Sequence, residues 1–293
     1  MGQLQVLPCL DSKQLAEDRR RELNLTPESA RNLGLSALQI LRTGEYQPES
    51  GRRVVLRHCI AACRERVVSI RPDDPLPQAT GKLFEHTRVQ VRNQTTLGAA
   101  RDLGQRGQAT LALNFANGLQ PGGGFLGGAR AQEESLCRSS ALFATLKNDP
   151  MYAFHWERGL NDSTNWAILS PGVPVFRGDD GALLETPWKL DFLTCAAPYV
   201  PDVGQPRAGE LLERRIHRVL SIARSWHYTS LVLGAWGCGE FGNDPERTAR
   251  DFRAALETVF DGVFEDVVFA ITDWSPNRRR LGPFRDVFAG HGL

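Results

Sequence analysis

Continuous apolar strands that alternate with amphipathic helices are the feature that most constrains how this chain folds. The segments "ATLALNFAN" (109–117), "TSLVLGAW" (229–236) and "EDVVFAITDW" (265–274) are apolar through their centres, whereas "GELLERRIHRVLSIARSW" (209–226) has a helical period. A strand that is apolar on both sides needs cover on both faces. The pattern therefore predicts an α/β domain with helices on both faces of the sheet.

The first 85 residues have a different, mainly helical pattern. Residues 12–24 and 26–46 both show helical spacing, and in the second Thr26 can cap a helix that starts at Pro27. The proline-rich segment "RPDDPLPQATG" (71–81) is the best candidate boundary. The sequence therefore predicts an N-terminal accessory region, residues 1–85, packed on a catalytic domain, residues 86–293. Within that domain we expect one helix over 133–147.

Charge and cysteine usage exclude several classes of function. Lysine plus arginine number 35 and aspartate plus glutamate 34, so the net charge is +1. Duplex nucleic-acid binding needs a basic surface, and we expect none here. No apolar run is long enough for a membrane span, and the N-terminus lacks a secretory signal. The six cysteines form no CxxC motif. We expect reduced thiols, no metal site and a cytoplasmic protein.

A glycine-rich loop follows the first of these strands and precedes a helix. Gly122, Gly123 and Gly124 form this loop, and a further seven residues lead to Gln132. Glycine permits positive φ, and its missing side chain lets backbone N–H groups approach a ligand. Such groups bind phosphates well. A flexible surface turn would have the same composition, so both interpretations are open.

A second strand, glycine-rich loop and helix follow at "LVLGAWGCGEFGNDPERTARDF" (231–252). Gly237, Gly239 and Gly242 match the GxGxxG pattern of dinucleotide-binding proteins. That pattern needs an acid about 20 residues further on, whereas the candidate, Asp273, lies 31 residues past Gly242. We therefore favour two loops that converge on one pyrophosphate over a Rossmann oxidoreductase.

Two adjacent carboxylates, Glu133 and Glu134, stand at the predicted start of the helix that follows the first loop. Neighbours on a helix lie ~100° apart around its axis, so the two need not face the same point. Acids at this position also stabilise a helix through its dipole. The functional alternative is a general acid or base with a neighbour that orients the ligand. A helix N-terminus lowers a carboxyl pKa, so a general acid here needs an environment that raises it.

These motifs resemble those of a known family. Gly122–Gly124, seven residues and Gln132–Glu133–Glu134 resemble the GGG-x(6–8)-QEE signature of poly(ADP-ribose) glycohydrolases. The surrounding sequence, the later "GAWGCGEFGN" and "SPGVPVFR" resemble the bacterial, microbial-type branch, so the similarity extends over most of the chain. The resemblance implies a macrodomain-like three-layer α/β/α fold with a mixed central sheet and a helical N-terminal extension.

The resemblance also implies a reaction and roles for individual residues. The enzyme would cleave ribose–ribose O-glycosidic bonds of poly(ADP-ribose) and release ADP-ribose, with Glu134 as general acid and base and no cofactor. Glu133 would hold the ribose hydroxyls, Gln132 would support the loop, and Asn117 would contact ribose. The two loops would cradle the diphosphate, and Phe241 would pack near the distal ribose. The residues implied in the second loop are Gly237, Cys238, Gly239, Phe241 and Gly242.

Two alternatives share these motifs: an ADP-ribose-binding macrodomain without catalysis, and a hydrolase of single ADP-ribose groups on proteins. The presence of both glutamates favours the polymer hydrolase. Its expected partners are poly(ADP-ribose), ADP-ribose and ADP-ribosylated proteins. The adenine-contacting region is predicted in "RNQTTLGAA" (92–100).

Overall fold

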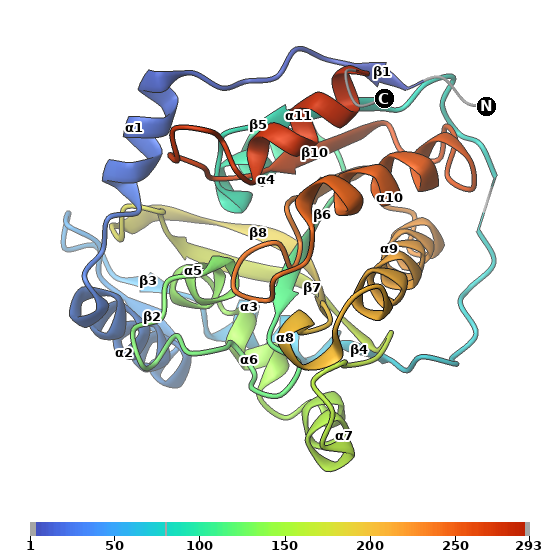
Figure 1. Cartoon of the computed structure of the whole chain (residues 1–293). Coiled ribbons are helices and arrows are strands. Elements are labelled where there is room, and N and C mark those ends of the chain that lie inside the picture. The colour runs from blue at the N-terminus through green and yellow to red at the C-terminus, as the bar shows by residue number, and fades with distance from the viewer. Residues whose placement is uncertain (1–3, 80, 291–293) are drawn as a thin grey trace.

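A computed structural model describes residues 4–79 and 81–290, and its centre is one eight-stranded sheet between two layers of helices (Figure 1). The strand order is β1-β5-β10-β9-β6-β8-β7-β4, and a separate two-stranded sheet pairs β2 with β3. The strands are β1 (Gln5–Val6), β2 (Glu45–Tyr46), β3 (Val54–Val55), β4 (Val68–Ile70), β5 (Arg88–Arg92), β6 (Thr110–Ala116), β7 (Ala167–Arg177), β8 (Leu183–Ala196), β9 (Ser230–Leu233) and β10 (Asp266–Ala270).

The sheet is mixed, as predicted. The strands from β1 to β8 in the sheet order are parallel to one another, whereas β7 is antiparallel to both β8 and β4. The described helices are α1 (Lys13–Glu22), α2 (Pro27–Thr43), α3 (Arg57–Glu65), α4 (Thr96–Gly104), α5 (Gln132–Ser139), α6 (Leu142–Leu146), α7 (Pro150–Arg158), α8 (Val200–Val203), α9 (Arg207–Ser225), α10 (Pro245–Glu257) and α11 (Leu281–Ala289).

Each face of the sheet packs on its own hydrophobic core. Apolar residues of α9, α10 and α11 cover one face, and those of α2 to α7 cover the other. The fully buried strands β9 and β10 are covered on both faces, which is why they are apolar after their first residues, Ser230 and Asp266. The α/β/α arrangement predicted from the sequence is therefore confirmed.

The N-terminal region contributes strands to this sheet as well as helices. Its first strand, β1, pairs with β5, and β4 pairs with β7, so the two edge strands of the sheet both precede residue 85. The helix α2 begins at Pro27 with Thr26 as its cap, as expected, and ends at Gly44 in the left-handed conformation. The boundary at residue 85 stays a prediction.

The prediction of a single helix over 133–147 is wrong. The structure has two helices, α5 and α6, because Ser140 adopts an extended conformation and forms a β-bridge with Val175. The backbone N–H of Ala141 donates to the carbonyl of Pro174 at 2.9 Å, and the Ser140 hydroxyl donates to the carbonyl of Leu136 at 2.7 Å. The backbone bond from Ala141 to β7 replaces a helical one, and the Ser140 hydroxyl closes the end of α5, so the tertiary contact overrides the local helical period.

The connections of β6 and β9 define where a ligand binds in such a sheet. The two strands are adjacent and parallel, yet the chain leaves β6 toward β8 and β7 and leaves β9 toward β10 on the other side. The helices that follow, α5 and α10, pack on opposite faces (Figure 1). In open α/β sheets, ligands bind at the carboxyl ends of strands at such a switch point. Both glycine-rich loops follow these two strands.

Candidate active site

Glu134 lies in the first turn of α5 with one carboxylate oxygen held and the other without a partner. The backbone N–H of Gly124 donates to Glu134 Oε1 at 3.0 Å. The side chain is only 8% exposed, and Oε2 is a buried atom with no hydrogen-bond partner among the described residues. A buried polar atom without a partner is costly in a folded protein. This oxygen therefore stands out as a group that can bond to a ligand.

Both carboxylate oxygens of Glu133 accept hydrogen bonds. Asn114 Nδ2 donates to Oε1 at 3.2 Å, and the backbone N–H of Asn117 donates to Oε2 at 2.7 Å. The residue is 3% exposed. Burial raises the pKa of the Glu133 carboxyl to about 8, although the bonds from Asn117 and Asn114 favour its charged form. For Glu133, burial therefore outweighs these hydrogen bonds.

Gly123 shows that the two carboxylates face the same point. Its φ is +56°, and a Cβ built there would overlap Glu134 Oε1 and lie 3.2 Å from Glu133 Oε2. The preceding Gly122 also has a positive φ, +71°. At Gly123, the space left by the missing side chain is taken by the carboxylate of Glu134. The expected approach of a ligand to the loop's backbone stays a prediction.

Gln132 ties the start of α5 to the end of β6. Its Oε1 accepts from the backbone N–H of Phe115 at 2.9 Å, and its Nε2 donates to the carbonyl of Leu113 at 2.8 Å. Asn117 bends the chain just after β6, because its Oδ1 accepts from the backbone N–H groups of Leu119 and Gln120. Both side chains therefore shape the loop that carries the three glycines.

The second glycine-rich loop is closed by Asn243. Its Nδ2 donates to the carbonyl of Pro198 at 2.9 Å, and its backbone N–H donates to the carbonyl of Gly237 at 3.0 Å. Both Gly237 and Gly242 have a φ of +74°, which disfavours other residues there. This loop is wound so tightly that a Cβ at Gly237 would lie 2.6 Å from Asn243 Nδ2.

The remaining predicted residues of this loop differ in exposure. Gly239 is exposed, and Phe241 is half-buried with its ring edge-on to Tyr199 at 5.6 Å between centroids. Cys238 is buried, its Sγ lies 3.5 Å from Thr248 Oγ1, and burial raises the pKa of its thiol to about 12. A thiol with that pKa stays neutral, so Cys238 fits a packing role and supplies no nucleophile.

The two loops meet at their bases. Gly234, at the start of the second loop, lies so close to Phe115 of β6 that a Cβ would be 2.9 Å from Phe115 Cζ. Farther along, a Cβ at Gly118 would lie 3.2 Å from Ala196 Cβ, and one at Gly237 would lie 2.7 Å from Ala197 Cβ. The two loops therefore pack against adjacent residues, Ala196 at the end of β8 and Ala197 just past it, so their bases lie close together.

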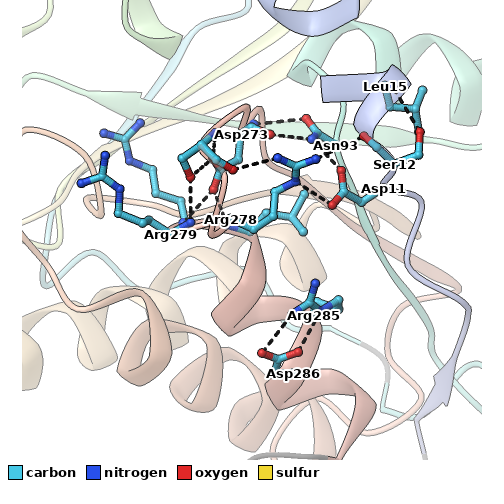
Figure 2. A network of polar contacts seen from close by, with 12 residues as sticks. Asp11, Ser12, Leu15, Asn93, Asp273, Arg278, Arg279, Arg285 and Asp286 are labelled. Atoms are coloured by element: carbon cyan, nitrogen blue, oxygen red, sulfur yellow. Dashed lines mark hydrogen bonds and ion pairs between the residues drawn. The ribbon is translucent and has the colours of Figure 1, made fainter. Parts of the chain in front are cut away.

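Asp273, the acid that a Rossmann interpretation needs, has another role. Figure 2 shows its carboxylate inside the turn that joins β10 to α11, near Asn93 and Arg278. It accepts from the backbone N–H and hydroxyl of Ser275 and from the backbone N–H of Arg280, at 2.6 to 2.8 Å. Because its oxygens are occupied by this turn, Asp273 has no free acceptor of the kind that dinucleotide ribose requires.

Comparisons with known proteins identify the family of this chain. A model of the microbial-type PARG catalytic domain matches residues 35–178, where PARG is poly(ADP-ribose) glycohydrolase. The PARG structure from Thermomonospora curvata is 40% identical and superposes with a TM-score of 0.83, over 88% of this chain and 98% of that one. The chain belongs to the microbial-type PARG family.

Other solved PARG structures extend this likeness. The Thermomonospora curvata enzyme bound to the inhibitor ADP-HPD is 41% identical, with a TM-score of 0.81 and coverage of 88% and 98% of the two chains. The enzyme from Deinococcus radiodurans in complex with ADP-ribose is 38% identical, with a TM-score of 0.72 and coverage of 79% and 98%. No curated protein sequence matches this chain. The family excludes the Rossmann alternative.

The structure of this PARG-family chain also assigns roles to residues that the sequence analysis missed. Asn114 joins Glu133 to Thr194 of β8, because its Nδ2 lies 3.2 Å from both Glu133 Oε1 and Thr194 Oγ1. A polar residue in an otherwise apolar strand was the available signal for Asn114. For Asn243 the signal was its place directly before the Asp244–Pro245 helix start. In the predicted adenine region, Asn93 donates to Asp11 and to the carbonyl of Asp273 (Figure 2).

Two further searches concern membranes and metals. Within residues 4–79 and 81–290, no helix is both long and apolar enough to cross a bilayer. In the same residues, no three His, Cys, Asp or Glu side chains gather as metal ligands would. All six cysteines are free thiols, and four of them are buried. The expectation that the protein binds no metal stays a prediction.

The raised pKa of Glu133 predicts how stability depends on pH. The pKa rises from an ordinary value of 4.5 to about 8 on folding. The stabilisation from the protonated carboxyl is therefore fully present below pH 4.5 and is lost as pH rises through 8. We expect Glu133→Gln to remove this loss. Between pH 5 and 8 the free energy of unfolding of the wild type should fall relative to the variant by up to about 1.4 kcal/mol per pH unit.

Urea denaturation of both proteins at several pH values measures this difference. Glu157→Gln, on the exposed face of α7, controls for the change in formal charge. Parallel curves for the wild type and Glu133→Gln from pH 5 to 9 would show that Glu133 ionises normally in the folded protein.

Proposed function

We propose that this protein is a poly(ADP-ribose) glycohydrolase that cleaves the ribose–ribose O-glycosidic bond and releases ADP-ribose. The observation that carries the proposal is the state of Glu134. Its Oε1 is fixed by the N–H of Gly124 and packs against Gly123, and its Oε2 is buried without a hydrogen-bond partner among the described residues. Membership of the PARG family supports the same reaction.

In the proposed mechanism, Glu134 in its protonated form donates to the oxygen that leaves the ribose. The glycosidic bond breaks through an oxocarbenium-like state, and Glu134, now a carboxylate, takes a proton from the attacking water. Glycosidases usually place two carboxyl groups across the sugar. Here the second carboxyl, Glu133, is adjacent, and both of its oxygens already accept hydrogen bonds from Asn114 and Asn117. We therefore assign Glu133 to the ribose hydroxyls and keep Glu134, whose Oε2 has no partner in the described part of the chain, as the acid and base.

The two loops bind the diphosphate in this proposal, and Phe241 covers the ribose. The glycine-rich loops over 122–124 and 237–242 are proposed to lie against the phosphates, because backbone N–H groups suit phosphate oxygens without adding charge. The N–H of Gly124 is already donated to Glu134. ADP-ribosylated proteins are the proposed substrates beyond free polymer, and the cytoplasm is the proposed location. Adenine is proposed to lie near the end of β5, within residues 92–100.

Purified protein on labelled poly(ADP-ribose) tests the reaction directly. We expect the polymer to shorten and free ADP-ribose to accumulate. Calorimetry with ADP-ribose and with NAD provides the binding control, and we expect the protein to prefer ADP-ribose. Intact polymer despite ADP-ribose binding would indicate a binding module. Release of ADP-ribose from singly modified proteins alone would indicate the mono-ADP-ribosyl hydrolase.

The convergence of the loops predicts that Phe241→Ala weakens both binding and hydrolysis. An aromatic ring beside the ribose excludes water and fixes orientation, so its removal should lower affinity and rate by roughly tenfold each. Polymer hydrolysis and ADP-ribose calorimetry measure the two effects. Phe154→Ala, an exposed aromatic of α7, is the matched control.

Amide exchange gives an independent test of the same convergence. Added ADP-ribose should protect residues 122–124 and 237–242 together. Protection of one loop only, with normal hydrolysis by Phe241→Ala, would refute a shared site.

A further inference from the structure

A small cavity lies between α5, which carries Glu133 and Glu134, the N-terminal region and the turn from β7 to β8. Its volume is about 20 Å³. Three arginines line it, Arg130, Arg138 and Arg177, together with Ser135 and Ser139 of α5. Its apolar wall comes from leucines of the N-terminal region. The cavity is thus lined by arginines and lies where the N-terminal region packs on α5.

Two of these arginines are buried without a carboxylate partner. Arg138 is 4% exposed and Arg177 is 2% exposed, and among the described residues neither forms an ion pair. Arg177 donates to the carbonyls of Leu33 and Arg138 and to the Ser36 hydroxyl, but its Nε has no hydrogen-bond partner. Buried charges are normally paired, because an isolated one is costly.

The charge around the cavity is positive. Asp179 is the only acid among its described lining residues, and its carboxylate accepts from Thr95 Oγ1 at 2.6 Å, with Arg19 as its nearby cation. The acid that acts on Arg138 is Glu134, one turn earlier on α5. Burial and the neighbouring Arg138 lower the pKa of Arg177 to about 10, so Arg177 keeps its proton at neutral pH. No described carboxylate neutralises it.

The size of the cavity selects the occupant. A cavity needs roughly 10–15 Å³ for one water molecule, so about 20 Å³ has room for a single-atom ion. We propose that this cavity binds one halide-sized monovalent anion, which neutralises Arg138 and Arg177 and thereby joins the N-terminal region to α5. The proposal is independent of the reaction assigned to Glu134.

Bromide provides a direct test, since it replaces chloride and scatters X-rays anomalously. Crystals of the full chain grown with bromide should show an anomalous peak between Arg138 and Arg177. Arg215 is an internal control, because it is equally buried and its Nε also lacks a partner, but Asp162 lies near it as a counter-charge. A peak at Arg177 and none at Arg215 is the expected result. Water density alone in the cavity would overturn the proposal.

Thermal unfolding tests the same site in solution. At constant ionic strength, replacement of gluconate by chloride should raise the melting temperature by roughly 2–4 °C once chloride exceeds its Kd about tenfold. Arg177→Met fills the position with an uncharged, apolar side chain and should abolish this chloride dependence. Arg64→Met, on the exposed side of α3, should keep it. Equal melting temperatures in both salts, or an unchanged chloride effect in Arg177→Met, would overturn the proposal. Where Arg177→Met fails to fold, the bromide experiment decides.

Discussion

Replacement of Glu134 by glutamine is expected to lower the rate of poly(ADP-ribose) hydrolysis by ~10²–10⁴-fold. The amide cannot donate the proton that the leaving ribose oxygen needs, nor can it take one from water. The shape of the side chain is retained, and its oxygen can still accept from the N–H of Gly124. The affinity for ADP-ribose, measured by calorimetry, should therefore stay within a few-fold of the wild type.

A matched control separates this effect from a general loss of charge. Glu246 occupies the first turn of α10 as Glu134 occupies that of α5, but it is exposed and paired with Arg250. Glu246→Gln should hydrolyse polymer at the wild-type rate. Near wild-type turnover by Glu134→Gln would remove Glu134 from the chemistry.

Gly123→Ala is expected to lower the rate of hydrolysis by about 10²-fold and to weaken ADP-ribose binding by roughly tenfold. The added Cβ would overlap Glu134 Oε1 and lie 3.1 Å from Glu134 Cδ, so the carboxylate must leave its position. The same substitution strains a residue whose φ is +56°. A misplaced catalytic group of this kind typically costs about 10²-fold in rate. Polymer hydrolysis and calorimetry measure both losses.

Gly51 provides a control that isolates the backbone strain. Its φ is +75°, similar to that of Gly123, but nothing lies within 4 Å of a Cβ built on it. Gly51→Ala therefore carries the strain without the collision and should keep full activity. Circular dichroism confirms that each variant is folded. A folded Gly123→Ala with normal hydrolysis would show that Glu134 is not held against the glycine loop.

The site could be predicted from the sequence in its parts, since each motif is contiguous. The spacing of Gly122–Gly124 and Gln132–Glu134 indicated the family, and the pattern of apolar strands indicated the layers. The role of each residue within the glycine motif was harder to predict from the sequence. Gly123 was predicted to make room for phosphate, yet the space belongs to Glu134, because the loop folds back onto the helix that follows it.

The break between α5 and α6 has the same origin. Leu136, Phe143 and Leu146 have a helical period, which predicts one continuous helix. Pairing of Ser140 with Val175, 35 residues away, satisfies the backbone differently. A local pattern does not contain this information, because the competing hydrogen-bond partners come from a distant strand.

The sequence by itself determined the features whose causes are local. The start of α2 at Pro27 follows from the Thr26 cap, and the burial of β9 and β10 follows from their apolar composition. Only the tertiary structure decided how each of the two adjacent glutamates is held. Glu133 is buried against Asn114 of β6, whereas Glu134 keeps an oxygen without a partner. The physical reason is that burial and desolvation depend on neighbours brought together by the sheet, and adjacent residues in a helix face different neighbours.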